Sequence, residues 1–67
     1  MNEFYKILVM FQRGEKVTRS RLLRLNGVTE DLLDGCIGKG LLIEFDKTDL
    51  GDTRYIITEK GIDVRDK

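Results

Sequence analysis

The spacing of apolar residues changes near residue 41, and this change constrains the fold class more than any other feature of the chain. Before it, four apolar residues follow the i, i+3, i+4, i+7 spacing of one buried helical face: Phe4, Ile7, Leu8 and Phe11. After it, residues 41–45 and 54–58 are short runs rich in β-branched and aromatic residues, which are typical of strands. The sequence therefore predicts an α+β fold, in which three helices precede a two-stranded antiparallel hairpin.

Threonines and glycines mark where the expected helices begin and end. The expected helices lie over residues 3–12, over residues 19–25, and between Thr29 and Gly40. Thr18 and Thr29 are suited to cap the second and third helices, because a threonine hydroxyl can accept a hydrogen bond from a free N–H of the first turn. Two further positions are expected to end the first and second helices: Gly14 and the pair Asn26-Gly27.

The second half of the chain is expected to form the hairpin and a short tail. The polar residues 46–53 join the two predicted strands and indicate a long, solvated hairpin tip. Thr58 is suited to cap a last helical turn over residues 59–62, and residues 63–67 are expected to fray. Lys16-Val17 is expected to be a short extended link between the first two helices.

These elements are predicted to share one core of apolar side chains. Its expected members are Phe4, Ile7, Leu8, Phe11, Leu22, Leu33, Cys36, Ile37, Ile43, Tyr55 and Ile57. With 67 residues, the chain forms a single expected domain over residues 1–67, and a chain of this size buries only about 60% of its unfolded surface. Its stability is therefore expected to be marginal.

The composition excludes several functional classes. One cysteine cannot form a disulfide within the chain, and the absence of histidine excludes a Cys/His zinc site and any Ser-His or Cys-His catalytic machinery. The longest apolar run, residues 7–11, is too short for a signal peptide or a membrane span. We therefore expect a cytoplasmic protein that is not an enzyme, uses no cofactor or metal, and does not enter a membrane.

A net charge of zero conceals an uneven charge distribution. Residues 1–27 carry six cations and two acids, whereas residues 28–53 carry seven acids and two cations. Residues 54–67 carry four cations and three acids. A basic first part and an acidic second part must therefore both be explained by any function assigned to the chain.

Two sequence patterns resemble those of winged helix-turn-helix domains. Residues 33–42, with Leu33, Cys36 and Lys39-Gly40-Leu41-Leu42, are similar to the LxxLxxKGLI pattern with which these domains pass from the third helix into the wing. Residues 55–61, with Tyr55, Ile57-Thr58 and Gly61, are similar to the YxLTxxG pattern at the end of the wing. The resemblance covers about residues 4–64 and is strongest to the very small winged-helix proteins of archaea, phages and prophages.

The resemblance implies a DNA-binding regulator, a winged helix with a short C-terminal helical turn. Two sets of residues are candidates for contact. The candidates for binding phosphates are Arg13, Lys16, Arg19, Arg21, Arg24, Lys47 and Arg54. The expected exposed face of the third helix consists of Glu30, Asp31, Asp34, Gly35 and Gly38. In DNA-binding relatives this helix enters the major groove, but here its three acids would be repelled by phosphates.

Two functions therefore remain open. The first is a small transcriptional regulator that binds double-stranded DNA mainly through phosphate contacts. The alternative is an interaction module, an adaptor or inhibitor, that presents its acidic third helix to a basic protein partner and does not bind DNA. A monomer or weak homodimer is expected in either case. A continuous positive face over the first two helices and the wing favours DNA, whereas cations scattered in ion pairs favour the protein partner.

Overall fold

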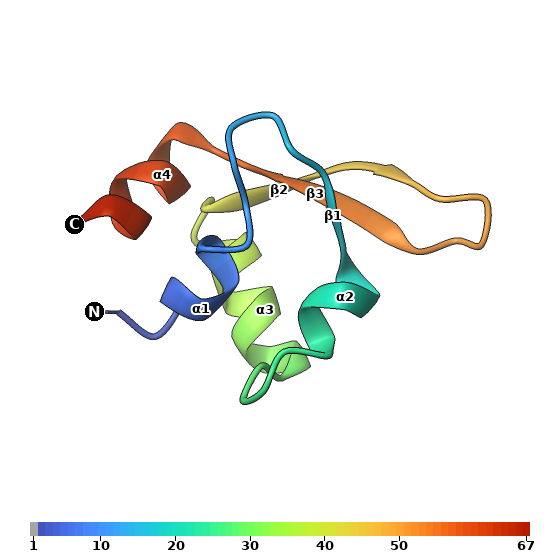
Figure 1. Ribbon diagram of the computed structural model, residues 1–67, viewed down its shortest axis with the longest axis horizontal. Helices are drawn as coiled ribbons and strands as arrows, with labels where there is room; N and C mark the ends of the chain where they lie inside the picture. The colour runs from blue at the N-terminus through green and yellow to red at the C-terminus, as the bar shows by residue number, and fades with distance from the viewer. Residues whose placement is uncertain (1) are drawn as a thin grey trace.

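A computed structural model describes residues 2–67 and shows an α+β architecture (Figure 1). Within these residues there are four helices and one antiparallel sheet of three strands. In chain order the elements are α1 (Tyr5–Leu8), β1 (Val17–Thr18), α2 (Arg19–Leu23), α3 (Glu30–Gly38), β2 (Leu42–Lys47), β3 (Thr53–Ile57) and α4 (Glu59–Asp66).

The sheet contains the predicted hairpin and one strand that the sequence pattern did not reveal. The strand order is β1-β3-β2, so that β3 lies in the centre. Tyr55 of β3 is opposite Val17 on one side and Glu44 on the other. The pair Val17-Thr18 had been expected to belong only to a link and a cap. A two-residue strand carries no periodicity of its own, and here it is stabilised by a partner far along the chain.

Three of the expected helices have different lengths in the structure. The first spans four residues instead of 3–12, because two i to i−3 hydrogen bonds, Met10 N–H to Ile7 O and Phe11 N–H to Leu8 O, each 3.1 Å, replace the continued helix. Gly14 therefore does not end this helix but lies in a later turn, with a φ of 80°. The second helix ends at Leu23 instead of residue 25.

The last helix is longer than predicted, since residues 63–66 continue it instead of fraying. Two side chains from outside the expected turn hold it against the N-terminal segment. Arg65 Nη1 donates to Phe11 O at 2.8 Å, and Asn2 Nδ2 donates to Val64 O at 3.2 Å. These contacts connect the two ends of the chain and are invisible in the local sequence.

The predicted caps are confirmed. The hydroxyl oxygens of Thr18, Thr29 and Thr58 accept hydrogen bonds from the N–H groups of Arg21, Leu32 and Gly61 at 3.3, 3.1 and 3.0 Å. Gly27 and Gly40 adopt φ angles of 83° and 77°, the left-handed conformation that the turns after α2 and α3 require.

The core lies between the helices and one face of the sheet. Nine of the eleven predicted core residues are buried: Phe4, Ile7, Leu8, Phe11, Leu22, Leu33, Cys36, Tyr55 and Ile57. Ile37 is only partly buried, and the prediction for Ile43 is wrong, because 49% of its surface is exposed. Leu42, opposite Ile57, occupies the core-facing position in β2, which turns its neighbour Ile43 outward.

We predict opposite effects of alanine at two glycines that lie in helices. A Cβ at Gly61 would be 2.2 Å from the backbone oxygen of Leu41, so Gly61→Ala should destabilise the fold by on the order of 3 kcal/mol. A Cβ at Gly38 would have no neighbour within 4 Å, so Gly38→Ala should stabilise it by up to about 1 kcal/mol. Urea unfolding of both variants measures this difference, and equal midpoints would contradict the close approach of α4 to Leu41.

Candidate functional site

Arg19 lies at the junction of α2, α3 and β3. Its Nη1 atom is 3.1 Å from Tyr55 Oη and 3.1 Å from Asp34 Oδ1, and its Nη2 atom is 3.9 Å from Glu30 Oε1. Its side chain is 26% exposed. The hydrogen bond to Tyr55 and the nearby Asp34 raise the pKa of Arg19 above its usual value, against the effect of burial. The guanidinium therefore makes its contacts within the chain and offsets part of the charge of α3.

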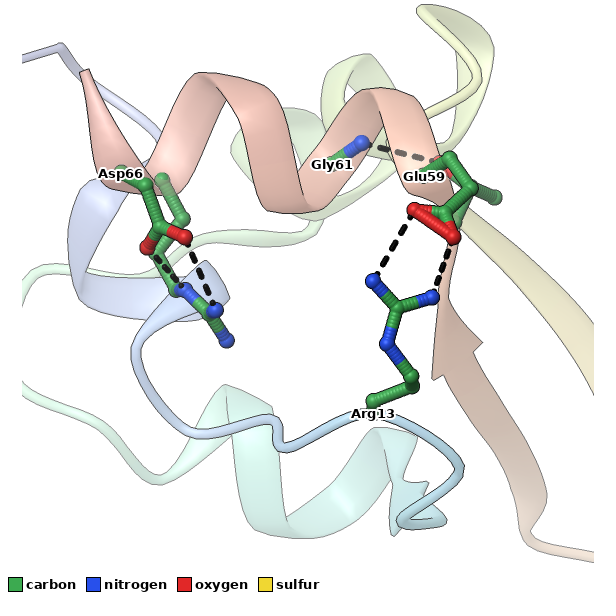
Figure 2. A network of polar contacts seen from close by, with 6 residues as sticks. Arg13, Glu59, Gly61 and Asp66 are labelled. Carbon is green, nitrogen blue, oxygen red and sulfur yellow. Dashed lines mark hydrogen bonds and ion pairs between the residues drawn. The ribbon is translucent and has the colours of Figure 1, made fainter.

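Two further cations from the expected basic set are also paired. Arg13, in the loop after α1, forms a two-pronged ion pair with Glu59 at the start of α4, with Nη2 to Oε2 at 3.1 Å (Figure 2). Arg54 forms a two-pronged pair with Asp46 across the hairpin. In each case the arginine is the first cause of a lowered pKa of its acid. Exposed pairs such as Arg13–Glu59 contribute little stability, but they do cancel charge.

The other four candidate cations have different surroundings. Lys16 places its Nζ 4.6 Å from the centre of the Phe45 ring, which is a cation–π contact on the outer side of the sheet. Arg21, Arg24 and Lys47 make no ion pair within residues 2–67. All three are exposed. The seven candidates are thus divided into three paired, one stacked and three unpaired cations.

The outward side of α3 presents carboxylates instead of hydrogen-bond donors. Glu30, Asp31 and Asp34 are all exposed, and the first two lie in the first turn, where they also suit the helix dipole. Gly38 is exposed and has open space around it. Gly35 differs from the expected exposed position, because it is only partly exposed and a Cβ there would be 3.7 Å from the Phe4 ring. We call Glu30, Asp31, Asp34 and Gly38 the acidic α3 face.

The hairpin tip is more ordered than a solvated loop, which the sequence pattern did not indicate. Asp52 accepts a hydrogen bond from Ser20 N–H at 3.2 Å and another from the Ser20 hydroxyl, and these bonds tie the tip to α2. Within the tip, Thr48 N–H donates to Asp52 O at 2.8 Å and Gly51 N–H donates to Thr48 O at 2.9 Å. Leu50 is 97% exposed on this turn.

The chemistry available elsewhere in the described part of the chain is sparse. Within residues 2–67, no group of three or more acids, Cys or His residues is placed to hold a metal ion. No helix there combines the length and the apolar character that crossing a membrane demands. Cys36 is buried, and burial raises the pKa of its thiol to about 11, so it stays protonated at neutral pH and acts as a small core residue.

Comparisons with models of protein families, with curated protein sequences and with solved structures gave no match for this chain.

We predict that Asp52→Asn weakens the fold at neutral pH and reduces its sensitivity to acid. The hydrogen bonds from Ser20 lower the pKa of Asp52 below its usual value of 3.8, so its contribution is present above that pH and is lost as the pH falls. Urea midpoints of wild type and variant should converge between about pH 5 and pH 2. Asp49→Asn is the control, since Asp49 forms no ion pair within the described chain. Parallel curves for wild type and Asp52→Asn would contradict the tether.

Proposed function

We propose that this chain is a winged-helix interaction module whose acidic α3 face binds a basic surface of a protein partner. The order of elements supports the winged-helix part of the proposal. The helices α2 and α3 are joined by a tight turn at Gly27, and the β2–β3 hairpin follows α3 directly (Figure 1). This is the order that the patterns at residues 33–42 and 55–61 lead one to expect.

The single observation that carries the functional part is the charge of the acidic α3 face. It offers three carboxylates and an open glycine, and Arg19, which pairs with Glu30 and Asp34, offsets only one of the three negative charges. Reading guanine in a major groove requires side-chain donors, and the phosphates on either side repel carboxylates. A surface that carries Lys or Arg side chains matches both the charge and the open space at Gly38.

We predict that Gly38→Lys weakens binding of a lysine- and arginine-rich helical peptide by at least about fivefold, through added charge and bulk. Gln12→Lys is a matched control, because Gln12 is exposed and the change adds the same charge away from α3. Titration of ¹⁵N-labelled protein with the peptide should move α3 amide resonances. Asp31→Asn should also weaken binding, and it is a cleaner change than Asp34→Asn because Asp34 also holds Arg19.

The same titration with a duplex of about 20 base pairs gives the opposing result. Under the proposal, adding DNA does not shift the amide resonances of α3. If DNA moves them and Gly38→Lys tightens that binding, α3 enters a groove and the proposal of a basic protein partner is wrong.

Backbone binding of DNA is a second candidate function, favoured by the unpaired state of Arg21 and Arg24 on α2. With Arg13, Arg19 and Arg54 held by acids, four candidate cations remain for phosphates, so the log–log salt slope should be no steeper than about −4. Arg21→Ala with Arg24→Ala should weaken binding equally on unrelated sequences. Fluorescence anisotropy at several salt concentrations measures both quantities, and a steeper slope would show that the ion pairs open on DNA.

A further inference from the structure

The hairpin tip carries an apolar side chain that no residue of the described range 2–67 covers. Leu50 is 97% exposed, far more than the other exposed large apolar residues, which range from 49% to 52%. The turn that carries it is held by the hydrogen bonds of Thr48 and by the bonds between Asp52 and Ser20. Gly51 provides the left-handed conformation, with a φ of 83°. The backbone of this turn therefore needs little further ordering when a partner binds Leu50.

A cavity lies at the opposite end of the molecule. Its volume is about 510 Å³, and its apolar lining comes from Phe4, Leu41 and Val64, between the N-terminal segment and α4. Its charged lining comes from Glu3, Lys39 and Lys60, all of which are exposed. Figure 1 shows the hairpin tip at one end of the long axis of the molecule and α4 with the two termini at the other end. The extent along this axis is 35 Å.

We propose that the hairpin tip of one copy inserts Leu50 into this cavity of a second copy. The charges of the two surfaces are complementary. Asp49, next to Leu50, is opposite in charge to Lys39 and Lys60 of the cavity, and Lys47 of the hairpin is opposite in charge to Glu3. The partly exposed Val64, with the small exposed parts of Phe4 and Leu41, gives Leu50 an apolar contact that it lacks in the single chain.

This contact joins two different surfaces, so each added copy still presents a free tip or a free cavity. Such head-to-tail contacts form open chains, or rings where the rotation between copies closes. A single tip in a single cavity is a small interface, so the association is weak and depends on protein concentration. It does not rest on the proposed function, because the tip and the cavity do not include the acidic α3 face.

Sedimentation velocity of the purified protein between about 10 μM and 1 mM tests the proposal. We expect the mean sedimentation coefficient of wild type to rise with concentration. Leu50→Asp should remain monomeric throughout, and so should the double variant Lys39→Glu with Lys60→Glu. Leu50 is almost fully exposed and both lysines are exposed, so the unfolding curves of the two variants should stay close to that of wild type.

Mixing the two monomeric variants provides the sharpest measurement. The Leu50→Asp chain keeps an intact cavity. A triple variant, which carries Asp49→Lys in addition to Lys39→Glu and Lys60→Glu, keeps Leu50 at its tip but has a basic residue beside it. Because the Leu50→Asp chain keeps both lysines at its cavity, the basic tip of the triple variant should bind that cavity poorly. The double variant Lys39→Glu with Lys60→Glu, which keeps Asp49 and Leu50, should instead form dimers with the Leu50→Asp chain. Nothing longer should form, because the dimer has no further intact tip or cavity. The triple variant alone should recover concentration-dependent association, because its tip and cavity charges are both reversed.

Ile43→Asp is the control for assembly through the sheet, since Ile43 is 49% exposed on its outer side. Three results would each overturn the proposal. They are a wild type that stays monomeric at about 1 mM, association that Leu50→Asp leaves unchanged, and association that Ile43→Asp abolishes while Leu50→Asp does not. Loss of the α3 response to a basic peptide would leave the proposal intact, so the two proposals fail separately.

Discussion

The other elements depend on the central strand β3 and on the contacts that it makes. It pairs with β1 on one side and β2 on the other, and its Tyr55 is 2% exposed. The ring of Tyr55 belongs to the core, while its hydroxyl accepts a hydrogen bond from Arg19 of α2. A large aromatic residue with a polar end can serve both purposes, because the apolar ring is buried and the oxygen finds a donor. Tyr55 thereby connects the central strand to α2 as well as to the core.

The same junction determines how charge is distributed over the surface. Residues 1–27 hold half of the twelve cations and residues 28–53 hold seven of the twelve acids, and the fold pairs two of these cations with acids from later elements. Arg19 meets Asp34, and Arg13 meets Glu59 of the last helix. The charge of two of the six cations of residues 1–27 is thereby offset. Among the candidate cations, Arg21, Arg24 and Lys47 form no ion pair within residues 2–67, and on α3 the same holds for Asp31.

The features that the sequence predicted correctly are those that depend on near neighbours. A threonine cap and a left-handed glycine act within three or four residues, so Thr29 and Gly40 could be recognised from the pattern alone. The errors concern contacts between distant residues. The strand β1 exists because of β3, and the end of α4 is held by Phe11 O and Asn2. Ile43 was placed in the core because an apolar run at a strand start gives no indication of which side faces inward.

The contacts that hold the candidate surfaces could not be predicted from the sequence either, and α2 shows the reason. Arg19 and Ser20 are consecutive residues in its first turn, yet one binds the acids of α3 and the other binds Asp52 of the hairpin tip. No spacing rule connects these pairs, since each partner belongs to a different element. The first turn of α2 thus orients both the acidic α3 face and the turn that carries Leu50. Because contacts within the chain already hold the backbone at both surfaces, a partner that bound either of them would have little backbone left to order.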